Sequence, residues 1–120
     1  MRFHLSEEQI AIQDAVRGTL GECWGMEQLH KFADGSDDFD PASWQALMEL
    51  GIGALALPES EGGAGLGLLD AALVCEVAGE AAAPGPLIGQ ILTAIAVSKS
   101  QNAATRELLP RIASGELVAT

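Results

Sequence analysis

Residues Leu50–Asp70 read LGIGALALPESEGGAGLGLLD, and the rest of the chain is arranged around this stretch. We expect a helix to end at Gly51, because glycine readily adopts the left-handed backbone that closes a helix. An apolar run follows and stops at Pro58, which has no N–H group for regular pairing. A glycine-rich loop then leads to a new helix near Asp70, whose carboxylate can cap free N–H groups. The stretch predicts a crossover between two helices.

The glycine-rich part of this stretch raises the alternative of a phosphate-binding loop. Its spacing, Gly63-Ala64-Gly65-Leu66-Gly67, does not give GxGxxG, and no lysine follows the glycines as a P-loop requires. A structural crossover is therefore the favoured interpretation. The nearby carboxylates Glu59 and Glu61 would need environments that separate their pKa values before they could do acid–base work. In a wet loop we assign them to helix-start electrostatics and solubility.

Composition indicates an all-α fold. The chain has 120 residues, of which 48% are hydrophobic and only 4% are aromatic. This length suits one domain, residues 1–120, with a real hydrophobic core. Runs of alanine and leucine favour helix, and clusters of β-branched residues are sparse. We expect an up-and-down bundle of about five to six helices.

Start and stop signals place these helices along the chain. Ser6 and Gln9 form a capping box, and Asp40 followed by Pro41 is a second strong start. Apolar periodicity places Ile10 and Leu108 on the inner faces of the first and last helices. The expected helices cover Ser6–Gly21, Trp24–Ala33, Pro41–Gly51, Asp70–Ala82, Leu87–Lys99 and Thr105–Ala113, the last with a kink or a break at Pro110. Leu117–Thr120 has strand character but no partner strand in the chain.

Charge and hydropathy exclude several classes of partner. The net charge of −11 would repel phosphate backbones and anionic membrane surfaces, so we expect no nucleic-acid binding. The apolar run Leu87–Val97 is too short to span a membrane and contains Gln90. The start of the chain shows neither a signal peptide nor an arginine-rich presequence. We expect a cytoplasmic location.

Few residues could carry chemistry. Cys23 and Cys75 match no metal-binding spacing, and we expect two reduced, packed thiols and no metal site. His4 and His30 are the only histidines, and neither has an identifiable partner that would orient it as a base. No nucleophile–base–acid triad can be identified. The residues themselves therefore nominate no catalytic group.

Three stretches in the right order resemble the N-terminal helical domain of flavin-dependent acyl-CoA dehydrogenases. The motif Leu-Gly-Ile-Gly…Leu-Pro-Glu-x-x-Gly-Gly-x-Gly…Asp lies within residues 50–70, Phe3–Gln9 is similar to the opening helix of the family, and Leu109–Thr120 is similar to its exit from this domain. The resemblance covers nearly the whole chain. It implies a parent enzyme that dehydrogenates the α,β-bond of an acyl-CoA thioester, with FAD accepting a hydride from the β-carbon.

The resemblance also implies which parts of that enzyme this chain lacks. Relatives add a middle β domain and a C-terminal helical bundle, which hold most of the FAD and supply a catalytic glutamate. We therefore expect no catalytic and no cofactor-binding residue in this chain, no tightly bound FAD, and no activity of the chain alone. Its expected partners are the acyl-CoA substrate and the missing domains.

What the resemblance leaves to this domain is a wall of the acyl pocket. That wall would be built at the start of the helix after the central one, so Leu87, Ile88 and Ile91 are the candidate substrate-binding residues. Apolar spacing at helical period equally predicts that all three are ordinary core. The surface facing the missing domains should be apolar, so we also expect a homo-oligomer.

Two other functions remain open at this stage. The first is a stand-alone helical interaction module that has the domain without the chemistry. The second is the N-terminal domain of a related flavin oxidase or nitroalkane oxidase, because these enzymes share the domain. The strand-like residues after Gly115 favour a truncated enzyme over the stand-alone module.

Overall fold

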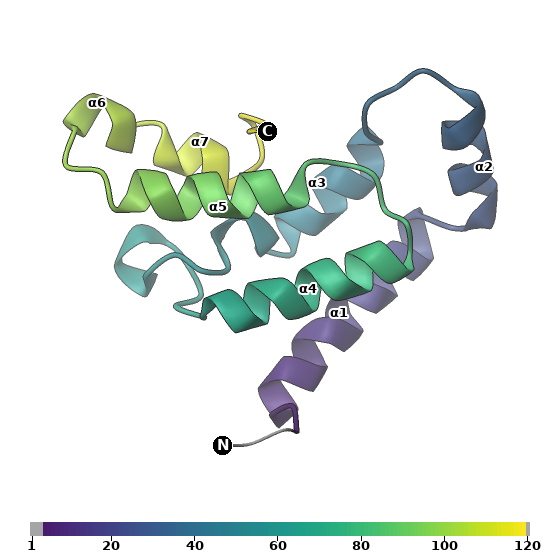
Figure 1. The fold of residues 1–120 in the computed structure, drawn as a ribbon, viewed down its shortest axis with the longest axis horizontal. Helices are drawn as coiled ribbons and strands as arrows, with labels where there is room; N and C mark the ends of the chain where they lie inside the picture. Colours follow the sequence, from purple (N-terminus) through teal and green to yellow (C-terminus); the bar gives the residue numbers. More distant parts are fainter. Residues whose placement is uncertain (1–3, 120) are drawn as a thin grey trace.

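The described residues form an all-α fold. The computed structural model describes residues 4–119, and within this range it contains seven α-helices, two 3₁₀ turns and no strand (Figure 1). The predicted fold class is confirmed. Phe3, in the opening of the family resemblance, and Thr120, in the strand-like tail, lie outside the described residues. The elements are α1 (Glu7–Cys23), α2 (Met26–Asp34), α3 (Pro41–Glu49), η1 (Ile52–Ala54), η2 (Glu59–Glu61), α4 (Leu68–Glu80), α5 (Leu87–Ser98), α6 (Ala103–Arg106) and α7 (Leu109–Ala113).

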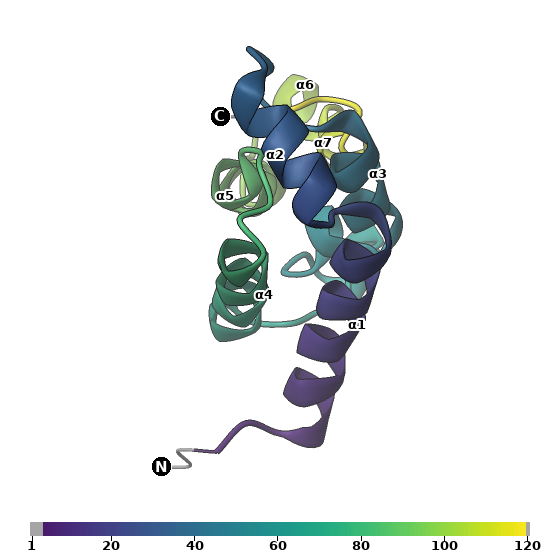
Figure 2. The same ribbon diagram turned by 90° about the vertical axis from the view of Figure 1, so that its right-hand side faces the viewer.

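The helices form a slab that is two helices thick. The molecule measures 44 × 38 × 19 Å, and one helix with its side chains is about 10 Å wide. Figure 2 shows the slab edge on, with α4 and α5 on one side and α1 and α3 on the other. Helix α1 packs against both α3 and α4, and α5 packs against α7 and η1. Helices α4 and α5 run in opposite directions, joined by the turn of residues 81–86 (Figure 1).

The starts predicted from capping signals are confirmed at α1 and α3, whereas α2, α4 and α6 each begin two residues from the expected position. The Ser6 hydroxyl accepts a hydrogen bond from the Gln9 N–H at 3.1 Å, and the Gln9 carboxamide oxygen accepts one from the Ser6 N–H at 3.0 Å. Asp40 caps α3 by accepting from the Ser43 N–H at 2.8 Å. Helix α4 begins at Leu68, two residues before the expected Asp70. Asp70 still stabilises the start of α4, because its carboxylate accepts a hydrogen bond at 2.8 Å from the N–H of Gly67, the residue before the helix.

The stretch after α3 folds as the predicted crossover. Gly51 follows α3 with a φ of +89°, the left-handed conformation expected at a helix end. The apolar run then turns inward and buries Ile52, Leu55 and Leu57. At Gly63 the returning chain lies so close that a Cβ atom would stand 2.1 Å from the Leu57 carbonyl oxygen. Only glycine permits this approach.

Two hydrophobic clusters hold the slab together. The larger joins α1, α3, α4 and the start of α5 and includes both tryptophans. The indole N–H of Trp24 donates to the Ala81 carbonyl at 3.0 Å, and that of Trp44 donates to the Gly115 carbonyl at 3.3 Å. Each buried indole thus has the acceptor it needs. The smaller cluster lies under α5 and α7 and contains Leu57, Ala94, Leu109 and Ile112.

Two predicted inner residues are exposed. Ile10 is 47% exposed, because it lies on the same side of α1 as the exposed Asp14 and Arg17 and not on the side of the buried Val16 and Leu20. Leu108 is 42% exposed, because the expected last helix is two short helices and Leu108 lies between them. The break follows from Pro110, which fits the first turn of a new helix but not the interior of a continuous one.

Candidate functional site

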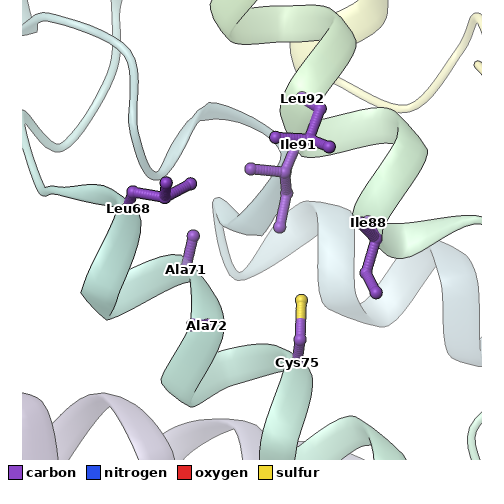
Figure 3. A pocket seen from close by; sticks show the side chains of 7 residues that line it. All are labelled: Leu68, Ala71, Ala72, Cys75, Ile88, Ile91 and Leu92. Carbon is purple, nitrogen blue, oxygen red and sulfur yellow. The ribbon is translucent and has the colours of Figure 1, made fainter.

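An apolar pocket opens between α4 and α5. Its volume is about 230 Å³, and Figure 3 shows its lining side chains coming from these two helices alone. On α4 the lining positions follow the spacing i, i+3, i+4, i+7, so they share one helix face. The pocket is lined by Leu68, Ala71, Ala72, Cys75, Ile88, Ile91 and Leu92.

The pocket is built by pairing small side chains with large ones. Ala71 and Ala72 on α4 leave the space that longer side chains would fill. Large apolar side chains form its rim: Leu68 is 64% exposed, Ile88 62% and Leu92 50%. An exposed apolar surface around an apolar hollow marks a site for an apolar ligand or an apolar protein surface.

The structure separates the three residues that the sequence nominated for substrate binding. Ile88 and Ile91 both line the pocket, Ile88 at its exposed rim and Ile91 almost completely buried. Leu87 is not among the lining residues; it is 8% exposed and belongs to the larger hydrophobic cluster. The α4 side of the pocket was not predicted, although the helical spacing of its residues is visible in the sequence: Leu68, Ala71, Ala72 and Cys75.

Cys75 points into the pocket from α4 (Figure 3). Burial raises the pKa of its thiol, because desolvation disfavours the charged thiolate. Burial likewise raises the pKa of the Cys23 thiol, which donates to the Thr19 carbonyl at 3.2 Å. The thiolate is the nucleophilic form of cysteine, so Cys75 presents a neutral, weakly polar surface at neutral pH. The pocket therefore holds no ionised group.

The glycine-rich loop has no free N–H groups for a phosphate. The N–H of Gly63 donates to Pro58 at 3.0 Å, that of Gly65 donates to Leu57 at 2.8 Å, and that of Gly67 donates to the Asp70 carboxylate at 2.8 Å. A phosphate-binding loop must point such groups at its ligand. The crossover interpretation is thus the correct one. Neither the loop nor the apolar pocket fits the phosphates of FAD, and we derive no chemistry through a flavin from these residues.

The remaining candidates for chemistry are separate surface residues. His4 and His30 are both exposed. Glu59 is exposed, whereas Glu61 accepts a hydrogen bond from the Arg106 guanidinium, which also binds carbonyls at the end of α5. Among residues 4–119 no three His, Cys, Asp or Glu side chains gather as a metal site would require. None of the helices in that range has the length and apolar character to cross a bilayer.

Comparison with known proteins identifies the family. The sequence profile described as "Acyl-CoA dehydrogenase, N-terminal domain" matches residues 6–116, and the chain belongs to this family. The acyl-CoA dehydrogenase IpdE2 of Mycolicibacterium smegmatis is 33% identical over 117 residues, which are 97% of this chain and 37% of that protein. IpdE2 of Mycobacterium tuberculosis is 33% identical over 116 residues, covering 93% of this chain and 36% of that protein.

A solved structure supports the same assignment. A variant of the Tcur3481-Tcur3483 steroid ACAD superposes with a TM-score of 0.83 at 30% identity. The match covers 93% of this chain and 31% of that chain. The chain therefore has the fold of the N-terminal domain and spans little more than a third of the curated relatives that it matches.

Proposed function

We propose that this chain is the N-terminal helical domain of an FAD-dependent acyl-CoA dehydrogenase and that its α4–α5 pocket forms part of the wall of the acyl-binding cavity. Ile88 and Ile91 contact the acyl group in this proposal, and Leu87 supports them from the core. The observation that carries the proposal is the pocket itself: an apolar hollow with no ionised group complements a hydrocarbon tail.

In this proposal the chain contributes part of the acyl pocket, and the rest of the enzyme contributes the FAD site and the catalytic base. FAD supplies the hydride acceptor of the reaction when it is bound. In this proposal the phosphate site and the catalytic base belong to the parts of the enzyme that correspond to the rest of the longer relatives, because the glycine-rich loop has no free N–H group for a phosphate. The chain alone is inactive and binds no stoichiometric FAD. Flavin absorbance that co-purifies at one equivalent with this chain would contradict this division.

The proposed location and assembly follow from the surface. Two free cysteines suit the reducing cytoplasm. Leu68, Ile88 and Leu92 leave an apolar face that the complete enzyme covers. By itself the chain self-associates through this face, so sedimentation should show oligomers. A monodisperse monomer across the accessible concentration range argues against an interface there.

Cys75 gives a direct test of the pocket, with Cys23 as internal control. The two thiols are alkylated with a maleimide, and each rate is followed by peptide mass spectrometry with and without octanoyl-CoA. We expect octanoyl-CoA to slow alkylation of Cys75 and to leave Cys23 unchanged, because only Cys75 lines the pocket. CoA without an acyl group should protect neither. Ile88→Glu, which places a charge at the exposed rim, should abolish the protection.

The solved neighbour favours one class of acyl group. Its name describes a steroid ACAD, which points to a bulky, ring-containing acyl group. A CoA thioester of cyclohexanecarboxylic acid should therefore protect Cys75 at lower concentration than hexanoyl-CoA does. Equal protection, or stronger protection by hexanoyl-CoA, would remove this preference but leave the acyl-pocket proposal standing.

A further inference from the structure

The C-terminal segment (residues 114–119) has no regular secondary structure, yet it is tied to the domain at alternate residues. The Gly115 carbonyl accepts the indole N–H of Trp44 at 3.3 Å. The Leu117 N–H donates to the Arg111 carbonyl at 3.0 Å. A chain end without contacts frays, so these bonds indicate a defined path.

Gln90 on α5 makes the remaining contacts. Its side chain is fully buried, and its amide nitrogen donates to the Leu117 carbonyl at 2.8 Å and to the Ile112 carbonyl. Its amide oxygen accepts from the Ala119 N–H at 2.7 Å. The opposite orientation of the amide would set oxygen against two carbonyls, so the partners fix the orientation. Every polar atom of this buried side chain is thus satisfied.

The pattern of these bonds is that of a neighbouring β-strand. In a parallel pair, one residue donates to the carbonyl before the facing residue and accepts from the N–H after it. The carboxamide of Gln90 does both, to Leu117 and Ala119, with Val118 as the facing residue. The strand-like part of the C-terminal segment therefore pairs with a side chain, that of Gln90, rather than with another strand.

The same helix turn of α5 carries both this contact and the pocket. Ile88 and Ile91 line the pocket, whereas Gln90 lies on the face turned toward α7 and the C-terminal segment. We propose that Gln90 is a positioning residue, which fixes the path of the C-terminal segment relative to the α4–α5 pocket by imitating a parallel strand. The inference rests on the proposed function only for the role of the pocket.

Amide exchange on the full chain tests the proposal with a matched control. Gln90→Met keeps the size of the side chain and removes all its hydrogen bonds. Gln13→Met removes glutamine bonds at another place, from the half-buried Gln13 on α1 to the Leu73 carbonyl at 3.1 Å and the Glu76 carboxylate at 3.3 Å on α4. Loss of one buried hydrogen bond changes an opening equilibrium about tenfold. We expect the Ala119 amide to exchange at least about tenfold faster in Gln90→Met, relative to α4 amides, and to be unchanged in Gln13→Met.

Gln90→Glu adds a second measurement, the pH dependence of amide protection at Ala119, which loss of packing alone would not change. Its carboxylate faces two carbonyl oxygens and is buried, so its pKa is raised above that of free glutamate. The protonated acid donates to one of these carbonyls, and this contact is lost as the pH rises through the raised pKa, where the carboxylate repels both carbonyls and displaces the segment that carries Ala119. Protection of Ala119 should return below that pKa in Gln90→Glu and show no such step in Gln90→Met.

Different results would overturn the positioning role of Gln90 and the acyl-pocket proposal. Equal Ala119 exchange in the natural chain and Gln90→Met would overturn the positioning role, as would a Gln90→Glu profile without a pH step. If Gln90→Met does not fold, the Gln90→Glu profile decides alone. Protection of Cys75 by octanoyl-CoA depends on neither result and tests the pocket alone.

Discussion

Substitution of Gly63 tests whether the stretch of residues 50–70 is a packed crossover. In Gly63→Ala the new Cβ would lie 2.1 Å from the Leu57 carbonyl oxygen and 2.5 Å from its Cβ, where ordinary contacts begin at 3.4 Å. Leu57 is completely buried, so it cannot move aside into solvent. The two chain segments must separate by about 1 Å, which costs about 1–3 kcal/mol in packing strain.

Separation also weakens two hydrogen bonds of the crossover. These join the Gly63 N–H to the Pro58 carbonyl at 3.0 Å and the Gly65 N–H to the Leu57 carbonyl at 2.8 Å. Each contributes about 1 kcal/mol. We therefore expect Gly63→Ala to lower the free energy of unfolding by about 2–4 kcal/mol, a large part of the stability of a domain this size.

The measurement is urea unfolding followed by far-UV circular dichroism, with Gly18→Ala as the matched control. Gly18 lies inside α1, and a Cβ there meets nothing within 4 Å. The control should raise stability by about 0.5–1 kcal/mol, because alanine is the better helix former. The reasoning is refuted if Gly63→Ala costs under about 0.5 kcal/mol, or if it stabilises as the control does.

Four further substitutions test particular contacts. Ile91→Ala should lower the free energy of unfolding in urea by about 2–4 kcal/mol, because Ile91 is 3% exposed. Ile88→Ala should lower it by under about 0.5 kcal/mol, because Ile88 is 62% exposed. Equal losses would show that Ile88 does not lie at the exposed rim of the pocket. Hydrogen bonds from the Gln9 side chain, and then from the backbone, hold the pKa of Asp70 below its usual value. The stability from these bonds is present above the unfolded pKa and lost as the pH falls through the lowered folded pKa, so Asp70→Asn should flatten the acid side of the stability curve below the usual aspartate pKa; an unchanged acid limb contradicts this. Ala82, two residues after α4, has a φ of +50°, so Ala82→Gly should raise the free energy of unfolding by about 0.5 kcal/mol in the same urea assay, and a decrease would contradict backbone strain at this position.

Local signals in the sequence predicted most of the helix boundaries. Ser6 and Gln9, Asp40 before Pro41, and Gly51 act through bonds or backbone angles within a few residues, so they can be read directly. The shift at Asp70 is of the same local kind, because a carboxylate can cap from the third helical position as well as from the cap.

Features that depend on packing between distant elements were not predictable. Ile10 fits an apolar stripe, but only the placement of α3 and α4 against α1 decides which side of that helix is covered. Gln90 read as a polar interruption of an apolar helix, and its role needs α7 and the C-terminal segment to be placed beside it. Half of the pocket was missed for the same reason: Cys75 and its neighbours on α4 become a lining only when α5 lies opposite.

The central claim is that the α4–α5 pocket receives the acyl group of a CoA thioester. Methyl NMR of the isoleucine-labelled chain during titration with octanoyl-CoA tests it most directly, with CoA alone as the control. We expect shifts at the methyl groups of Ile88 and Ile91, which line the pocket, and none at Ile112, which lies in the smaller hydrophobic cluster. Shifts at Ile112 but not at Ile88, or the same shifts with CoA alone, would contradict it.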